Sequence, residues 1–258
     1  MDPNLRQPVR AATVAELAWV GTDGRPDALP VIPLLLDIEP AIAYPYAYAD
    51  LARQIAAAPA VALTISEPRM TGSGWRPLAA TGRARLIEDK DGELFKSALL
   101  TEELRKYPPS RALADSLMLR REHWWYVPRM IVVLDLTPPI PVEPRVDASS
   151  RVLAAWNGDQ LHVDTVRVAD AGQDRLEVTS LAGRKVPDGR AALVGHDFSE
   201  PDLEQWTPWT TRGDLSGGVL AVTEWPERTT LEPVPKLRER FRRQRDLERA
   251  CRAALESR

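Results

Sequence analysis

The chain has 258 residues, 44% of them hydrophobic and 28% charged, which is typical of a globular protein long enough for two domains. Its net charge of −3 provides no positive potential that would attract nucleic acid, and no apolar run is long enough to cross a membrane. The single cysteine, Cys251, excludes an internal disulfide and a cysteine-based zinc site. The N-terminus lacks the basic segment followed by an apolar core that is typical of a secretory signal. We therefore expect a cytoplasmic protein without nucleic-acid or membrane partners.

The N-terminal part predicts three strands and a short helix. The first strand is apolar apart from Glu16 and is followed by a Gly-Thr-Asp-Gly turn. The second contains Pro30 and Pro33, each of which removes a ladder donor, so we expect an edge or bulged strand. Asp50 would cap the helix, which ends before Pro59. The predicted strands span residues 14–20, 29–36 and 42–48, and the helix spans 51–58.

A pair of strands around a Gly-rich loop organises the first half. Val61–Ile65 is a short apolar run between prolines, and Leu78–Ile87 alternates apolar residues with Thr and Arg. Two helices and a strand follow, over residues 93–104, 110–121 and 124–136.

A proline-rich segment separates the two halves. Thr137–Pro144 has four prolines among eight residues, which predicts a stiff linker. We expect a first domain over residues 1–136, a linker over 137–149, a second domain over 150–230 and a charged C-terminal helix over 231–258. Further strands are predicted at 152–156, 161–168, 176–180, 191–197 and 219–223.

The two halves share spaced anchors. Trp206, Pro208 and Gly213 lie 131 positions beyond Trp75, Pro77 and Gly82 respectively. Such a common interval predicts an internal repeat.

The C-terminal segment from Lys236 is dense in Arg and Glu and carries one narrow apolar stripe. It is interpreted either as a solvated helix docked along that stripe or as an arm that pairs two chains.

The order of these elements resembles the FMN-binding split barrels, the pyridoxamine-phosphate-oxidase-like proteins. The resemblance covers residues 13–136 and rests on Gly24-Arg25-Pro26 with Pro30, on Ile42–Tyr48, on Pro59-Ala60-Val61, and on Trp75–Leu86 with its central Gly82. It implies a mainly β fold with flanking helices (α+β): two split β-barrel domains in tandem, forming a pseudo-dimer, plus the C-terminal helix. Residues 150–225 look like a shortened second copy.

The resemblance also implies a flavin site in a cleft between the barrels. The family usually has Thr-Ser before the helix and a Lys within it, whereas this chain has Tyr46 to Tyr48 and then Leu51. The phosphate would therefore be held by the second copy, or else by Arg53. The candidate phosphate ligands are Thr179, Ser180, Arg184 and Lys185, and the candidates to line the ring are Tyr46, Trp75, Arg76 and Trp206. The alternatives are ordinary turn charges at Arg184 and Lys185, and packing roles for the tryptophans.

These features favour an FMN-binding oxidoreductase acting on a small molecule of unknown identity. The cofactor would carry the hydride, in agreement with the lack of a nucleophile motif. A deazaflavin would suit the same cleft. The alternatives are a cofactor-free split barrel used for binding or scaffolding, and a haem-binding relative in which His196 is a ligand instead of a structural residue. The intramolecular pseudo-dimer leaves open a further homodimer.

Overall fold

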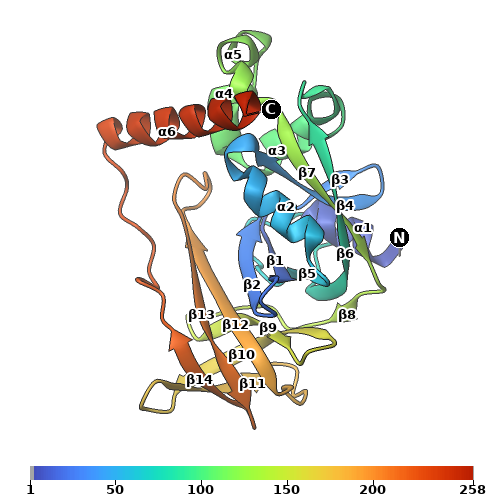
Figure 1. Cartoon of the computed structure of the whole chain (residues 1–258), viewed down its shortest axis with the longest axis vertical. Coiled ribbons are helices and arrows are strands. Elements are labelled where there is room, and N and C mark those ends of the chain that lie inside the picture. Colours follow the sequence, from blue (N-terminus) through green and yellow to red (C-terminus); the bar gives the residue numbers. More distant parts are fainter. Residues whose placement is uncertain (1–2, 258) are drawn as a thin grey trace.

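The computed structural model describes residues 3–257 as two β units joined by a linker, with helices around the first unit and a long C-terminal helix (Figure 1). The predicted fold class, mainly β with flanking helices and two barrel-type units in tandem, is confirmed. No helix between residues 3 and 257 combines the length and apolar character needed to cross a bilayer.

The first unit is a curled sheet. Its strands are β1 (Ala15–Val20), β2 (Pro26–Val31), β3 (Leu34–Leu36), β4 (Glu39–Pro45), β5 (Val61–Ile65), β6 (Leu78–Asp89), β7 (Arg129–Leu136) and the short β8 (Ile140–Pro141). They pair in the order β2-β1-β5-β6-β7-β4-β3, with β8 beside β6. The two end strands, β2 and β3, are parts of one extended segment broken at Ile32 and Pro33, as the prolines predicted. The sheet therefore curls round one large apolar core.

Helices cover this curled sheet. They are α1 (Pro3–Ala11), α2 (Ala49–Ala57), α3 (Leu100–Lys106), α4 (Arg111–Ala114) and α5 (Leu117–Glu122), with a π-helical turn at Phe95–Leu99. The buried Lys106 ammonium donates to the carbonyls of Val9, at 2.7 Å, and Pro33, at 2.5 Å, and so ties α1 and the β2–β3 break to α3. Three predictions were wrong here. Tyr46–Tyr48 form a 3₁₀ turn after Pro45 and are not part of the strand, and Asp50 lies inside the first turn of α2 without capping it. The strand predicted over 124–136 begins only at Arg129, because Trp124–Tyr126 form another 3₁₀ turn.

The second unit is a closed barrel of β9 (Ser150–Trp156), β10 (Leu161–Asp170), β11 (Arg175–Ser180), β12 (Gly189–Phe198), β13 (Trp206–Ser216) and β14 (Val219–Glu224). Its interior is a smaller apolar cluster that includes Leu153, Leu193 and Leu220.

The two units have the same strand pairing. In the first, the antiparallel pairs are β1–β2, β1–β5, β5–β6, β6–β7, β4–β7 and β3–β4. In the second they are β9–β10, β9–β12, β12–β13, β13–β14, β11–β14 and β10–β11. Taking β2 and β3 as one broken strand, each pair of the first unit has one counterpart in the second.

Gly82 and Gly213 occupy equivalent places in this pairing. Gly82 lies opposite Val61 and Leu136, and Gly213 lies opposite Ala191 and Val222. A Cβ at Gly82 would meet the Asp135 carbonyl oxygen at 2.0 Å, and a Cβ at Gly213 would meet that of Ala221 at 2.1 Å. In both units, glycine allows the neighbouring strand to approach at the same point.

Gly82→Ala and Gly213→Ala are each expected to lower the free energy of unfolding by about 1–3 kcal/mol, because the added methyl displaces a backbone carbonyl. The matched control is Gly72→Ala, since a Cβ there meets its nearest atoms at ordinary distances of 3.7 Å or more. Urea denaturation gives the free energy of unfolding of all three variants. A Gly82 or Gly213 variant as stable as the control would contradict the close approach.

The two units also face each other with approximate two-fold symmetry. On one side of the interface, β2 lies against β12 and β13. On the other side the two units exchange roles: β10, the counterpart of β2, lies against β5 and β6, the counterparts of β12 and β13. β1 packs on its own counterpart, β9. Such a self-complementary interface is typical of a two-fold dimer, here formed within one chain.

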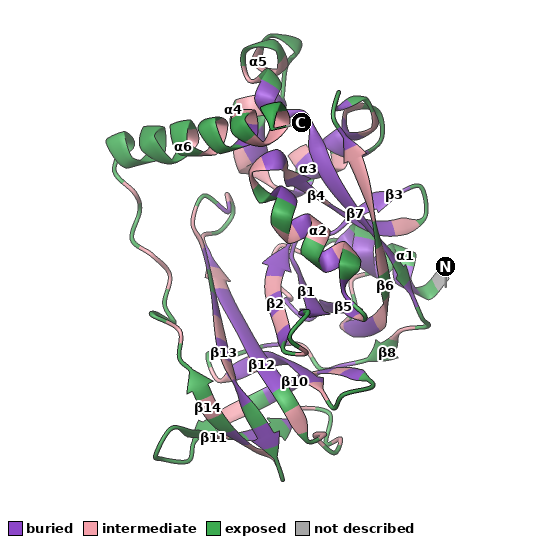
Figure 2. Cartoon of the chain, in the orientation of Figure 1, coloured by how far each residue is buried: buried purple, intermediate pink, exposed green. Residues whose placement is uncertain are grey.

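The segment after β14 runs along the outside of the second unit and leads to α6 (Leu237–Glu256), as Figure 1 shows. The C-terminal half of α6 docks on the first unit through Leu247, Cys251 and Leu255. Leu237 and Phe241, in its N-terminal half, are exposed, and Figure 2 shows most of this half coloured as exposed.

Candidate functional site

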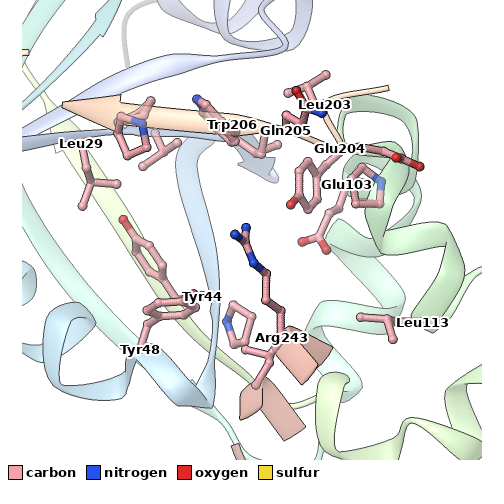
Figure 3. Close-up of a pocket in the computed structure, with 18 of the residues that line it drawn as sticks. Leu29, Tyr44, Tyr48, Glu103, Leu113, Leu203, Glu204, Gln205, Trp206 and Arg243 are labelled. Carbon is pink, nitrogen blue, oxygen red and sulfur yellow. The ribbon is translucent and has the colours of Figure 1, made fainter. Parts of the chain in front are cut away.

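A cavity of about 770 Å³ lies where the first unit, the second unit and α6 meet. We call it the Tyr44 cavity. Its walls come from segments far apart in sequence: β2, β4, the helical region from Glu103 to Leu113, the residues leading into β13, and the segment that ends in α6 (Figure 3). Its volume lies within the range of small-molecule sites, about 300–1,000 Å³.

The wall of the cavity is mainly aliphatic and aromatic. The apolar and aromatic residues in it include Leu29, Val31, Ile32, Leu34, Ile42, Tyr44, Tyr48, Leu51, Tyr107, Leu113, Tyr126, Leu203, Trp206 and Leu247. The 3₁₀ turn after Pro45 leaves Tyr48 half exposed. Flat aromatic side chains at opposite walls favour a flat ligand.

Two polar groups of this wall lack partners. The enclosed Tyr44 hydroxyl has no hydrogen-bond partner among residues 3–257, and neither has the Trp206 indole N–H. Burial raises the pKa of Tyr44, which keeps the phenol protonated. Buried polar groups of this kind are nearly always satisfied in proteins, and a ligand with acceptor atoms would satisfy these.

Glu103 supplies a carboxylate. Its Oε1 accepts from the Ser110 hydroxyl at 2.7 Å, from the Tyr126 hydroxyl at 3.1 Å and from the Arg129 guanidinium at 3.3 Å. Its Oε2 has no hydrogen-bond partner within the described chain, so this oxygen is available to a donor in the cavity.

The cations near the cavity are already paired. Arg243 reaches into the space between Tyr44 and Glu103 in Figure 3, and its Nη2 lies 2.7 Å from Glu239 and 3.2 Å from Glu232. Glu204 is paired with Arg240 at 2.8 Å. The lining side chains thus carry three carboxylates, on Glu103, Glu204 and Glu232, and one guanidinium.

Of the residues predicted for the flavin site, Trp206 lines this cavity. It stands 6.3 Å from the ring of Tyr107 and, edge-on, 6.3 Å from that of His196. Tyr46 is buried in the core beside the cavity, whereas its neighbours Tyr44 and Tyr48 line it. The sequence offered a signal that was missed: Tyr recurs at every second position from 44 to 48.

The predicted phosphate ligands of the second copy lie at the symmetry-related cleft. There the Ser180 hydroxyl donates to Asp164 at 2.7 Å, and Arg184 pairs with the same carboxylate at 3.0 Å. Arg184 also donates to the carbonyl of Pro141, at 2.8 Å, and Pro141 is paired with Leu78 of β6. Asp164 and the linker strand β8 therefore hold the two predicted phosphate ligands Ser180 and Arg184.

The other predicted residues lie apart from the cavity wall. Arg53 bridges Asp50, at 3.2 Å, and Glu88, at 3.3 Å. Arg76 donates to the carbonyl of Asn4 at 2.7 Å. Trp75 packs partly buried against the first core, and Thr179 and Lys185 are exposed. Their proposed role in binding a flavin stays a prediction.

His196 belongs to a buried ionic cluster between the two units. Its Nε2 lies 2.9 Å from Glu16 of β1, which is also 3.0 Å from Arg145 of the linker. Arg145 contacts Glu67 at 3.2 Å, and Ser66 donates to Glu16 at 3.0 Å. Burial opposes the charge of Glu16, yet Arg145 and His196 hold the pKa of its carboxyl below its ordinary value. Burial and Arg145 lower the pKa of His196, which therefore remains neutral.

No model of a known protein family matches the chain. Solved structures with a likeness include HutZ, a heme storage protein from Vibrio cholerae (14% identity, 54% of this chain and 93% of that chain, TM-score 0.38). A heme binding protein from Mycobacterium smegmatis aligns over 96% of both chains at 12% identity and a TM-score of 0.34. A pyridoxamine 5'-phosphate oxidase-related, FMN binding protein from Nostoc punctiforme aligns over 80% of this chain and 91% of that chain (14% identity, TM-score 0.29). Scores this low establish neither a shared family nor a shared ligand, and the strand pairing alone supports the tandem barrel architecture.

Proposed function

We propose that this protein is a tandem split-barrel binding protein whose Tyr44 cavity holds a flat, largely apolar and uncharged aromatic molecule of the size of a flavin ring. The observation that carries the proposal is the composition of the cavity. An apolar wall built by both units surrounds an unpaired Tyr44 hydroxyl, which suits an acceptor, and the free Glu103 Oε2, which suits a donor. A flavin ring bears both kinds of group along one edge.

The residues present do not fit the phosphate of FMN at this cavity. A phosphate needs cations whose charge is not already balanced, but Arg243 is paired with Glu232 and Glu239, and the lining carboxylates outnumber the lining guanidinium. An oxidoreductase that depends on FMN is therefore less well supported than binding of an uncharged ring. If a flavin ring is bound, it supplies hydride transfer, and the chain's own part is to bind and orient it.

Haem fits the cavity less well. Its lining residues include no histidine, cysteine or methionine. Burial raises the pKa of three of its four tyrosines, Tyr44, Tyr107 and Tyr126, and so keeps these phenols protonated. The His196 ring is engaged with Glu16 and Arg145. The two carboxylates of haem would also meet the same shortage of free cations.

Titration of the purified protein with riboflavin, followed by flavin fluorescence, tests the proposal. We expect riboflavin to bind and FMN to bind more weakly. Leu113→Trp, which fills the cavity, is expected to weaken riboflavin binding at least tenfold. Leu117→Trp in the same helical region is the matched control, because Leu117 is exposed and outside the cavity. Absence of binding by any flat aromatic probe, or equal affinity in the two tryptophan variants, would overturn the proposal.

A further inference from the structure

A second cavity, of about 540 Å³, lies at the junction of the two units and is separate from the Tyr44 cavity. We call it the junction cavity. It is bounded by the segment after β5, by the end of the linker and the start of β9, by β12 and β13, and by the segment before α6. The residues that matter for its chemistry are Glu67, Arg69, Arg145, Asp147, Arg151, His196, Asp197 and Trp209.

Arg151 is a half-buried cation without a carboxylate partner. Its Nη1 donates to the carbonyls of Ala148, at 2.5 Å, and Ser150, at 2.8 Å. Within residues 3–257, no carboxylate lies within 4.0 Å of this guanidinium, and its Nε and Nη2 have no hydrogen-bond partner. The guanidinium lies 5.5 Å from the ring centroid of Trp209, so the indole forms one wall beside it.

Arg145 brings a second guanidinium to the same cavity. Its Nε donates to Ser66 at 3.0 Å, and its Nη2 contacts Glu16 and Glu67. Its Nη1 has no partner within the described chain. Burial, and then the charge of the Arg145 guanidinium, lower the pKa of Arg151, while the charge of Asp147 offsets part of this repulsion. A bound anion would relieve that repulsion.

The carboxylates of the junction cavity are paired with groups other than Arg151. Arg69 binds Glu67 at 2.8 Å and Asp197 at 2.8 Å. Asp147 accepts from the backbone N–H of Ser149 at 2.9 Å and from the hydroxyls of Ser149 and Ser150 at 2.6 and 3.0 Å. Being exposed, Asp147 is largely screened by water. Asp147 offsets part of the charge of Arg151, but none of these three carboxylates lies within 4.0 Å of its guanidinium.

We propose that the junction cavity is a binding site for a small oxyanion, either a phosphate or a carboxylate group, held by the free donors of Arg151 and Arg145 beside the Trp209 ring. Guanidinium groups bind such anions through two parallel charge-assisted hydrogen bonds. The site uses no residue of the Tyr44 cavity, so a test of this site does not depend on whether the proposed function is correct.

Thermal unfolding of the full chain in inorganic phosphate, in acetate and in sodium chloride, at constant ionic strength, tests this site. Binding to the folded state raises the midpoint with ligand concentration. We expect phosphate, acetate or both to raise it above the chloride value, and the more effective anion identifies the phosphate or the carboxylate as the group recognised. Arg151→Gln is expected to weaken the apparent affinity at least tenfold. The control, Arg175→Gln, changes an exposed arginine of β11 and should leave it unchanged.

Circular dichroism and the midpoint in chloride show whether Arg151→Gln is folded. If that variant does not fold, Arg151→Lys replaces it, since lysine keeps the charge but loses the paired donors. The proposal is overturned if neither anion exceeds chloride, or if the folded Arg151 variant responds to the anion as strongly as the wild-type protein.

Discussion

Arg145→Met is expected to lower the free energy of unfolding by about 3–5 kcal/mol, because it leaves the buried Glu16 without a cation and takes from Glu67 one of its two. Arg145 is 3.0 Å from Glu16 and 3.2 Å from Glu67, and the side chains of all three are no more than 6% exposed. The cluster joins β1 of the first unit to β12 of the second through the linker, so we expect both units to be loosened at their junction.

Urea denaturation measures this loss. Arg85→Met is the matched control, because Arg85 pairs with Glu39 at 2.5 Å in a setting where both side chains are at least 35% exposed. An exposed pair of this kind contributes about 0–1 kcal/mol. If Arg145→Met lowered the free energy of unfolding no more than Arg85→Met does, the buried cluster would not hold the two units together.

Arg129→Met should destabilise the first unit to a similar extent, about 3–5 kcal/mol, for the same reason. Arg129 is fully buried and pairs with Glu103 at 3.3 Å. Its guanidinium also lies 4.0 Å from the ring centroids of both Phe95 and Tyr126. Methionine can keep much of that packing but cannot neutralise Glu103.

A second substitution separates the charge from the packing. In Arg129→Met combined with Glu103→Gln, no buried charge is left unpaired, and we expect most of the lost stability to return. Chemical denaturation of the wild-type protein, both single variants and the double variant gives the coupling energy. A double variant no more stable than Arg129→Met alone would show that packing of the guanidinium, and not its charge, is the larger contribution.

Local patterns predicted much of the fold. The short apolar run Val61–Ile65 between prolines is β5 without change of bounds, and the broken strand at Pro33 was visible because proline removes ladder donors. The shared interval that includes Gly82 and Gly213 predicted two units with equivalent pairing. Glu16, the lone acid of the apolar first strand, carried a further signal that no prediction used, since a buried acid needs a partner.

The candidate site could not be predicted in the same way. The Tyr44 cavity is built from segments near residues 30, 44, 105, 206 and 240, and no local pattern tells which segments meet. The family resemblance directed attention to Ser180 and Arg184, and the structure brings these two together. Ser180 and Arg184 both bind Asp164 beside β8, because the linker returns along β6 and does not leave that cleft open. The path of a linker is a tertiary property that composition does not encode.

The pairing of β8 with β6 has a consequence for how the two units divide their tasks. Two barrels related by a two-fold axis would present two like sites, and any ligand would impose the same demands on both. Here the linker and Asp164 engage Arg184 in the second barrel, so the two barrels do not offer a ligand the same side chains. The second barrel instead contributes through other side chains: Trp206 lines the Tyr44 cavity, and Arg151 and Trp209 line the junction cavity.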